Sequence, residues 1–521
     1  MDRELMDKEV LCILDTRQIQ RYIFRSNSMF ETVGASNLLT HILQDALLYS
    51  LNHIDPPVPE EEYDLSLDEN ARIPYFADPR VQFQLMTCTA GNAMFIARTG
   101  ALAQKIIRKV SRYYLDHGRM LDVAAAAVER TDDLDQDLSR MYRKLDAVKA
   151  SSETLAPAGT LPVCMRERRT GEPVLDFDRI TGEPLSRASV QKREEAAMRS
   201  GLVRLEDIHT TTGHDGKEYR AVIHADGNNI GITVQKILKE ALDYEAGIRF
   251  RRRVINNIEQ TIAGVMERSI KQLKDYYQEV TGKTDGFEKE FQVVGRAGDD
   301  INCICNAIWA FPFLKLFYRN LKGAVIWKSE TMETPFFACG GVAFVTADNA
   351  FHPAFFLAED CCSNAKKVAK KKENLRNGLA GNWVDFQVLD NPNSQNLEVL
   401  RERFYMTSER ISLLMRPYSL DPEAEETEIS FSRLMDRVRT IRTLQLSPFQ
   451  EAAFRQSYLS GKSEFRRFLF YMKKKGIDLT GLLGDPLYTD GDKQLHAAWF
   501  DAAELTDFIP FDRGRTDSCT E

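Results

Sequence analysis

The sequence predicts an α+β protein, in which two copies of one strand-and-helix plan are joined by a polar connector and followed by a helical segment. Three observations support this. Short apolar runs of strand length alternate with longer helical patterns up to about residue 394. The order of these elements is repeated within the chain. From about residue 395 onward the pattern is helical, with charged faces and no glycine-rich loop.

The first copy is expected to cover residues 1–150. A short apolar run that ends at Asp15 has the length and composition of a buried strand. The segment Val33 to Asn37 is expected to open a helix, and residues 53–75 are rich in Pro, Glu and Asp, which is typical of a loop. The remaining predicted elements are two strands within 81–98 and helices at about 100–117 and 130–150.

Three further regions complete the predicted organisation. Residues 151–215 are polar and contain the short echo Thr-Gly-Glu-Pro at 170–173 and 181–184, so they are interpreted as an irregular connector. The second copy is expected over residues 216–394 and the helical region over 395–521. The second copy's predicted elements are strands at 219–226, 290–295, 301–306, 336–345 and 383–389, with helices at about 231–280 and 353–373.

The two copies match most closely at a strand end and a turn. The first strand ends at Asp15, and its copy has the turn Ala90-Gly91-Asn92-Ala93. The second strand ends at Asp226, and its copy has the turn Ala297-Gly298-Asp299-Asp300. The interval from Asp15 to Asn92 is 77 residues, and that from Asp226 to Asp299 is 73. We therefore interpret the chain as an internal duplication.

Charge distinguishes the two turns. Aligned in this way, Asn92 and Ala93 occupy the places of Asp299 and Asp300. A Gly-Asp-Asp sequence alone is often an ordinary acidic turn. Here apolar strands flank it, and Asp226 ends another strand. Only the second copy is therefore predicted to hold a pair of divalent cations.

The predicted chemistry is nucleotidyl transfer with Mg²⁺ or Mn²⁺. Two such ions about 3.5–4 Å apart activate an attacking hydroxyl and stabilise a leaving pyrophosphate. Mg²⁺ takes oxygen ligands and keeps substrate phosphates among them. Asp226, Gly227 and Asp299 are expected at the metal site, with Asp300 as a second bridging carboxylate. Gly227 and Gly298 would also let backbone and phosphate approach closely.

Three further residues are candidates for binding nucleotide. Lys366, on a predicted helix, would bind a phosphate as a compact cation, although a solvated lysine is an equal alternative. Ser36 and Asn37 are expected at a helix N-terminus, where phosphate oxygens bind, and simple capping is the alternative. His224 is expected on the same side of its strand as Asp226, where it packs or lines the site.

Composition narrows the classes of protein. Because the net charge is −8, any binding of nucleic acid or triphosphate is expected to use local basic patches. The candidate patches are Arg249 with residues 251–253, and the lysines within 366–372. The alternative for each run is a solvated helix face. No run of about 18 apolar residues occurs, and the first residues do not resemble a signal peptide. The expected location is the cytoplasm. The cysteines lie mostly in apolar runs without a C-x-x-C pair, which indicates reduced thiols and no zinc site.

These motifs together resemble a known family. The segment Ile19 to Leu39, with Val33-Gly34-Ala35-Ser36, resembles the opening of the large polymerase-like subunit of type III CRISPR effector complexes. Residues 225–231 (Ala-Asp-Gly-Asn-Asn-Ile-Gly) and 295–300 (Gly-Arg-Ala-Gly-Asp-Asp) resemble the two metal motifs of its second palm domain. Phe337-x-Cys339-Gly340-Gly341-Val342 and Ala365-Lys366 resemble a later strand and helix of that domain.

The resemblance implies a fold and an activity. The fold would be two ferredoxin-like palm domains of the nucleotidyl cyclase type, the first of them degenerate, with an insertion between them and a helical terminal domain. The activity would be the joining of ATP into cyclic oligoadenylate second messengers. By resemblance Asp226, Asp299 and Asp300 would bind metal, while Ser36, Asn37, Asn229, Gly298 and Lys366 would touch nucleotide.

The sequence departs from the family pattern at several points. The HD nuclease domain is expected to be absent, because the first strand begins near residue 9. The zinc-binding cysteines between the palms are missing, and Cys164 stands alone in the connector. Asn228 stands where many relatives have Asp, and Ala297 where many have Gly. These departures indicate a divergent member and weaken the expectation of subunits of a CRISPR RNA complex as partners.

Three functions remain open from the sequence. The first is a nucleotide cyclase that makes a second messenger from nucleoside triphosphates. The second is an architectural or RNA-binding subunit of a type III CRISPR ribonucleoprotein, with the arginines of the helical C-terminal region at its contacts. The third, template-directed polymerisation, is disfavoured by the acidic net charge. The sequence does not determine the base preference of the enzyme, the ring size of its product, its activating signal or its oligomeric state.

Overall fold

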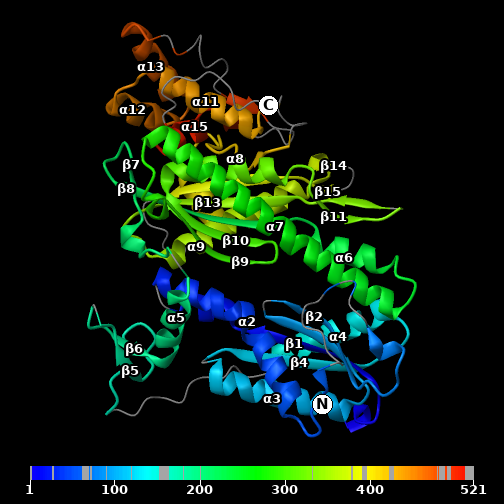
Figure 1. Ribbon diagram of the computed structural model, residues 1–521. Coiled ribbons are helices and arrows are strands. Elements are labelled where there is room, and N and C mark those ends of the chain that lie inside the picture. The colour runs from blue at the N-terminus through cyan, green and yellow to red at the C-terminus, as the bar shows by residue number, and fades with distance from the viewer. Residues whose placement is uncertain are drawn as a thin grey trace.

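Two sheets with helices on their faces organise the chain, and a helical C-terminal part lies beyond the second sheet (Figure 1). The predicted α+β class is confirmed. The computed structural model describes residues 1–521 except 1–2, 26–27, 61–67, 69, 71–72, 90, 119, 152–162, 180, 200, 331, 377–378, 390–395, 422–426, 478, 480–486, 490–494 and 511–521.

The first sheet is fully antiparallel, with the strand order β2-β3-β1-β4. Its unit consists of β1 (Val10–Arg17), α1 (Ile19–Phe24), α2 (Met29–His53), β2 (Phe83–Thr89), β3 (Asn92–Ala97), α3 (Gly100–His117), β4 (Asp122–Glu129) and α4 (Leu134–Ser151). The predicted helix at 100–117 is confirmed, and the apolar segment after it forms β4.

The second sheet repeats this order as β9-β10-β8-β13 and extends it with β16, which is parallel to β13, and with β17 (Tyr418–Ser419). A short strand, β7 (Thr211–Thr212), pairs with the start of β8. The unit consists of β8 (Glu218–Gly227), α6 (Ile230–Leu238), α7 (Tyr244–Thr281), β9 (Phe291–Ala297), β10 (Asp300–Asn306), α8 (Ala310–Leu321), β13 (Ala338–Thr346), α9 (Phe351–Ala369) and β16 (Trp383–Leu389). Two small hairpins accompany it: β11 (Val325–Lys328) with β12 (Glu333–Pro335), and β14 (Leu375–Arg376) with β15 (Leu379–Ala380).

The strand register corrects how the two turns align. Asp15 pairs with Asn92 across β1 and β3. In the second unit Ala225 pairs with Ile301, so Asp226 lies opposite Asp300 at the ends of β8 and β10. Asn92 is therefore the counterpart of Asp300 and not, as the sequence spacing predicts, of Asp299. The counterpart of Asp299 in the first copy is Gly91. Ala90 of the predicted turn lies outside the described residues.

Alternation along β8 decides which side chains face which helices. Ile223 and Ala225 are buried in the large core beneath α7 and α8. Val222, one residue earlier, belongs to the core on the opposite face, under α9. Because strand side chains alternate, His224 and Asp226 share the α9 face with Val222. This places the Asp226 carboxylate on the side of the sheet that α9 covers.

The first unit also packs against this α9 face. Phe24 of α1 and Val33 of α2 join the core formed by Phe351 and Phe355 of α9. The Phe24 and Phe355 rings lie 4.3 Å apart between their centroids. Figure 1 accordingly shows α2 directly beneath the second sheet. The face that carries Asp226 is therefore bordered by both units.

Helix α7 makes a second connection between the units. Its 38 residues begin against the first unit, where Tyr244 and Ile248 pack with Leu134 of α4. Arg252, almost fully buried, donates to the carbonyls of Leu85 and Met86 in β2 at 2.6 and 3.1 Å. The basic run at 251–253 is thus used within the protein, since Arg251 donates to Tyr142 and Arg253 lies over the Trp327 ring.

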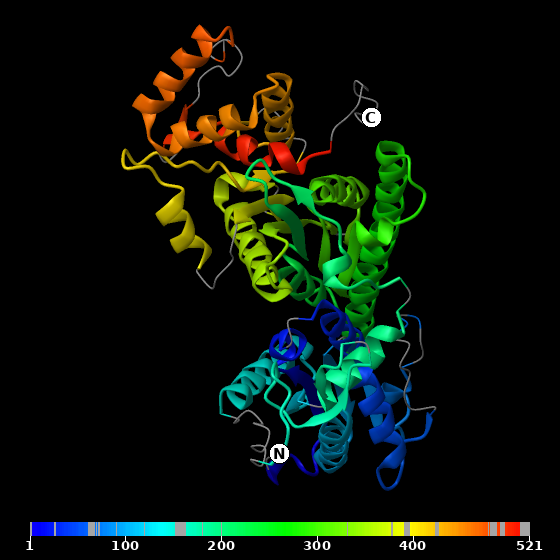
Figure 2. The same cartoon turned by 90° about the vertical axis from the view of Figure 1, so that its left-hand side faces the viewer.

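The described part of the connector is more ordered than the irregular segment that the sequence predicted. It forms β5 (Val174–Phe177), β6 (Pro184–Ser186) and α5 (Arg187–Ala197), and Ser186 caps α5 by accepting from the amide of Ser189. Helix α5 packs on α2 so closely that a Cβ on Gly34 would lie 1.7 Å from the carbonyl oxygen of Lys192. Figure 2 shows this segment beside the first unit.

The C-terminal part contains helices that pack onto the second unit. They are α10 (Leu397–Phe404), α11 (Phe431–Thr443), α12 (Pro448–Leu459), α13 (Lys462–Lys474) and α15 (Phe500–Leu505), and β18 (Leu487–Thr489) pairs with β19 (Leu495–Ala497). The fully buried Asp501 accepts hydrogen bonds from the amide of Met415 and the hydroxyl of Tyr418. Because Tyr418 is part of β17, this contact ties α15 to the edge of the second sheet.

Two properties of the described residues bear on the composition analysis. None of their helices has both the length and the apolar character needed to cross a bilayer. Their cysteines are all free thiols. Of the five expected to be buried, Cys12, Cys303, Cys305 and Cys339 are buried, whereas Cys88 is only half-buried.

We predict that Gly341→Ala destabilises the protein, because a Cβ there would lie 1.9 Å from the carbonyl oxygen of Ala358 and force α9 away from β13. Overpacking of this kind costs about 1–3 kcal/mol. Gly231→Ala in α6 is the matched control, since a Cβ there meets nothing within 4 Å and alanine favours the helix by up to about 1 kcal/mol. Urea denaturation measures both. Equal midpoints for the two variants would contradict this packing.

Candidate active site

Neighbouring strand ends bring the three predicted acidic residues together. Strand β8 ends one residue after Asp226, and β10 begins at Asp300 beside it. Asp299 lies in the turn between β9 and β10, and its side chain is hydrogen-bonded to that of Asp226. All three side chains are partly exposed. The carboxylates that the sequence grouped from positions 226, 299 and 300 therefore meet at one accessible edge of the second sheet.

Lys366 is the fourth charged member of this group. It lies on α9, and its ammonium donates to Asp226 Oδ2. The side chains of Lys366 and Asp226 are 21% and 34% exposed. Burial lowers the Lys366 pKa, but the charge and hydrogen bond of Asp226 outweigh burial and raise it. The lysine predicted to bind phosphate is thus a permanent cation that contacts a carboxylate.

Burial and the neighbouring Asp226 charge raise the pKa of both Asp299 and Asp300. Burial and the adjacent Asp226 charge raise the pKa of Asp299 to about 7, although Lys366 opposes the shift. Burial is also the main cause of a raised pKa at Asp300, and the Asp226 charge adds to it while His224 opposes it. The Asp300 side chain remains 42% exposed, so solvent screens this effect. Carboxylates that repel one another in this way favour a bound cation.

His224 and Asn302 hold Asp300 on its inner side. His224 Nδ1 lies 3.3 Å from Asp300 Oδ1 and 2.8 Å from Asn302 Oδ1. Asn302 Nδ2 donates to Asp300 Oδ1 at 3.2 Å. His224 itself is nearly buried, with its ring edge against Phe355 at 5.6 Å between centroids. His224 therefore both packs and borders the site.

Asp226 and Asp299 offer oxygens of the kind that a divalent cation binds, although the side chains of the cluster are engaged with one another. Among the described residues, no group of three or more His, Cys, Asp or Glu side chains is arranged so that it could hold a metal ion. Asp226 is paired with Lys366, and Asp300 is directed to His224. Asp226 and Asp299, however, already contact each other and offer carboxylate oxygens, which Mg²⁺ prefers. Binding of Mg²⁺ or Mn²⁺ stays a prediction.

Each of the two glycines at the site, Gly227 and Gly298, is needed for a different structural reason. A Cβ on Gly227 would lie 2.6 Å from Asp299 Oδ2, so Gly227 makes room for the Asp299 carboxylate. Gly298 has a φ of +60° with open space around it. That conformation suits glycine in a tight turn. Both glycines thus shape the carboxylate cluster itself, and their contact with phosphate is a prediction.

The two asparagines after Asp226 anchor the strand end. Asn228 is buried and donates to the carbonyl of Gly381 at 2.7 Å and to Cys339 Sγ at 3.0 Å. Asn229 has a φ of +64° at the start of α6, and its side chain donates to the carbonyl of Ala380 at 3.4 Å. Asn228 therefore belongs to the support of the site, and an asparagine at this position supplies amide donors that an aspartate lacks.

The prediction that Ser36 and Asn37 lie at a helix N-terminus is wrong. Helix α2 begins at Met29, capped by Ser28, so both residues lie within the helix and their amides are used there. The sequence Ser28-x-x-Glu31 is a capping signal that would have located this start. Asn37 donates to the Glu195 carboxylate of the connector at 2.8 Å.

Ser36 nevertheless reaches the second unit. A Cβ on Gly295 of β9 would lie 2.8 Å from Ser36 Oγ. Gly295 pairs with Asn302, which in turn contacts Asp300. The Ser36 hydroxyl of the first unit therefore lies against β9, and β9 is the neighbour of β10, the strand that begins at Asp300.

An ion pair in the first unit matches the one in the second. Lys149 of α4 donates to Asp15 Oδ2 at 2.6 Å. Asp15 is the counterpart of Asp226, and Lys149 follows the end of β4 at Glu129 by the same 20 residues that separate Lys366 from the end of β13 at Thr346. The sequence did not predict this pair, because a single lysine on a helix has no distinguishing motif.

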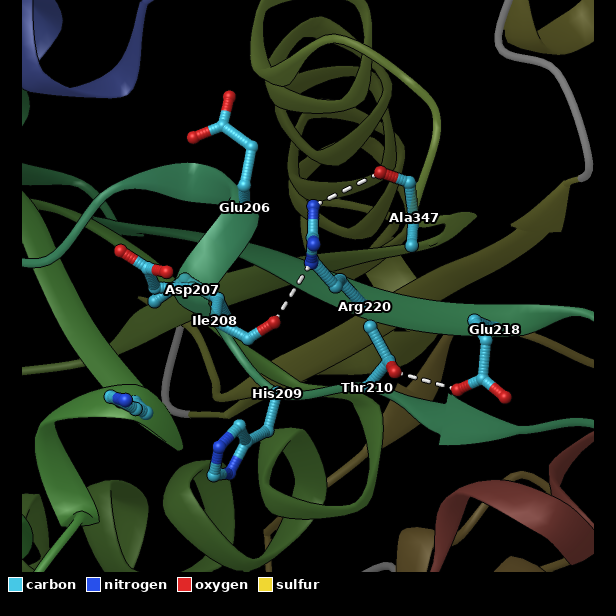
Figure 3. A pocket seen from close by; sticks show the side chains of 9 residues that line it. Glu206, Asp207, Ile208, His209, Thr210, Glu218, Arg220 and Ala347 are labelled. Carbon is cyan, nitrogen blue, oxygen red and sulfur yellow. Dashed lines mark hydrogen bonds between the residues drawn. The ribbon is translucent and has the colours of Figure 1, made fainter. Parts of the chain in front are cut away.

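A separate pocket lies at the opposite end of β8 (Figure 3). There Arg220 donates to the carbonyls of Ile208 and Ala347 at 3.2 and 3.0 Å. Thr210 donates to Glu218 at 2.6 Å. Glu218 and Asp226 are eight residues apart on one strand, about 26 Å at 3.3 Å per residue. This pocket is therefore distinct from the carboxylate site.

We predict that Asp299→Asn stabilises the metal-free protein at high pH. The folded state holds the Asp299 proton up to about pH 7, whereas an ordinary Asp releases it near 3.8. The wild type therefore loses stability relative to the variant as the pH rises through this window. Thermal denaturation in EDTA should give equal melting temperatures near pH 4 and a variant melting temperature higher by on the order of 1 °C at pH 8. The exposed Asp275→Asn is the control; a pH-independent difference for Asp299→Asn would refute the shift.

The comparisons with known proteins give structural likeness only. No family model matches the chain, and no curated protein matches it. The chain is similar to a Csm1–Csm4 cassette in complex with cA4, with 14% identity and a TM-score of 0.48 over 96% of this chain and 69% of that one. A Csm1–Csm4 cassette in complex with one ATP is 13% identical, with a TM-score of 0.49 over 97% and 70%. The Csm1–Csm4 subcomplex of the type III-A CRISPR-Csm interference complex is 14% identical, with a TM-score of 0.48 over 97% and 70%.

Proposed function

We propose that this chain joins nucleoside triphosphates into a cyclic oligonucleotide second messenger by two-metal nucleotidyl transfer. The observation that carries the proposal is the meeting of Asp226, Asp299 and Asp300 at one accessible sheet edge, with a lysine beside them. ATP as the substrate, and a role in antiviral defence, follow from the sequence resemblance to type III CRISPR subunits.

The proposal extends to the architecture. Each unit has the connectivity β-α-β-β-α-β and the same strand order, β2-β3-β1-β4 and β9-β10-β8-β13, which is that of a ferredoxin-like palm. We assign residues 1–150 to a degenerate first palm and 216–394 to a catalytic second palm. Residues 151–215 form the insertion between them, and residues 395–521 form the C-terminal domain.

In this proposal the acidic residues hold the cations. Asp226 and Asp299 would bind one Mg²⁺ or Mn²⁺ ion, and Asp300 would bind a second. Such ions activate an attacking hydroxyl and stabilise the leaving pyrophosphate. The protein's own contribution is to fix these oxygens on paired strand ends, so that little reorganisation is needed during the reaction.

Other residues of the site would position the nucleotides. Lys366 would neutralise charge on the triphosphate, and the open turn at Gly298 leaves space beside the carboxylates. Ser36 enters from the first unit, so the two nucleotides would be held by different halves of the chain. Holding both reactants in register lowers the entropic barrier to their reaction.

The proposal predicts that the purified chain, incubated with ATP and Mg²⁺ or Mn²⁺, forms cyclic oligoadenylates that mass spectrometry detects. Asp226→Asn and Asp299→Ala should each lower the initial rate by about 100-fold or more, because each removes a metal ligand. Asp275→Ala, an exposed residue of α7, is the matched control and should keep the wild-type rate.

Absence of product with ATP, GTP, CTP and UTP, with and without added guide RNA and target RNA, would refute the proposed function. Copurification of small RNA with such an inactive protein would favour the alternative, an architectural subunit of a type III CRISPR ribonucleoprotein complex.

A further inference from the structure

Equivalent Asp–Lys ion pairs have different surroundings in the two copies of the repeat. In the first copy, Lys149 and Asp15 pair at 2.6 Å beside Gly91 and Asn92, neither of which carries a charge. One lysine there balances one carboxylate. The pair is part-buried, with 20% of the Asp15 side chain exposed.

In the second copy, the corresponding turn contributes Asp299 and Asp300 beside the pair of Lys366 with Asp226. Asp299 is hydrogen-bonded to Asp226, and Asp300 adds a further repulsive charge. Lys366 therefore supplies one positive charge to a cluster of three carboxyl groups. This excess of acidic groups favours a second cation, and a divalent ion would use the same Asp226 Oδ2 that Lys366 contacts.

We propose that a divalent cation binds this site by exchange, in which the Lys366 ammonium leaves Asp226 as the cation binds to Asp226 and Asp299. The inference rests on the proposed function, because the cation site is the same. Lysine suits such an exchange, since its charge sits on a flexible four-carbon stem. About a fifth of the Lys366 side chain is exposed, which leaves it room to turn outward.

The exchange has a consequence for the protein without nucleotide. The ion pair of Lys366 with Asp226 lowers the affinity of the site for a metal ion that binds without nucleotide. When no metal is bound, the same ion pair stabilises the acidic cluster. The pair of Lys149 with Asp15 has no adjacent carboxylate from its turn and stays closed. The duplicated ion pair is thus structural in the first copy and replaceable in the second.

Titration of the full chain with Mn²⁺ alone, followed by the electron paramagnetic resonance signal of free Mn²⁺, tests this inference. Lys366→Met keeps the apolar stem and removes the charge. It should lower the Mn²⁺ dissociation constant about fivefold, which corresponds to the upper range for a typical partly exposed ion pair. Lys366→Arg keeps the charge and should bind Mn²⁺ about as weakly as the wild type.

Two controls define the outcomes. Lys149→Met removes the matching lysine and should leave the Mn²⁺ affinity unchanged, whereas Asp226→Asn should remove the binding; thermal denaturation confirms that each variant is folded. Unchanged or weaker Mn²⁺ binding by Lys366→Met, or equal tightening by Lys149→Met, overturns the exchange but leaves the proposed cation site in place. If neither the wild type nor Lys366→Met binds Mn²⁺, or if Asp226→Asn binds as the wild type does, both the exchange and the site are refuted.

Discussion

Antiparallel pairing of β8 with β10 is the constraint on which the site depends. It sets Asp226 opposite Asp300 although the two are 74 residues apart in the sequence. Strand side chains alternate, so a slip of one residue in this pairing would turn one carboxylate toward the core under α7. The pairing of β8 with β13 and the close approach of α9 at Gly341 then carry Lys366 to the same edge. The large apolar core positions β8 and β10, which carry Asp226 and Asp300. A separate core under α9 positions the helix that carries Lys366.

Much of the fold and the acidic part of the site could be predicted from the sequence. Buried strands with apolar neighbours leave a clear pattern, and β16 begins and ends where the pattern indicated. The grouping of Asp226 with Asp299 and Asp300 followed from the repeat, which compares two segments under the same physical constraints. The exact alignment of the turns did not follow, because Gly91 and Asn92 differ by one position from the counterparts that sequence spacing suggested.

The errors arose where tertiary contacts or short signals decide the structure. The start of α2 depends on the cap at Ser28, and the glycine at 34, which looked like a helix start, instead serves the contact with α5. The connector was predicted to be irregular because its ordered part is stabilised by residues far away in the sequence. Glu31 of α2 forms ion pairs with Arg193 and Arg169 of the connector, at N–O distances of 2.9 and 3.5 Å. Such pairings between distant segments leave no periodicity in the sequence.

Helix α7 has a mechanical consequence. A 38-residue helix is a rod of about 57 Å, and its two ends are embedded in different halves of the molecule, at Tyr244 against α4 and at Leu273 in the core of the second sheet. A rod clamped at both ends resists stretching and sliding far more than it resists twisting or gentle bending. A change of spacing at the border between Ser36 and β9 would therefore require one half to rotate about the axis of α7.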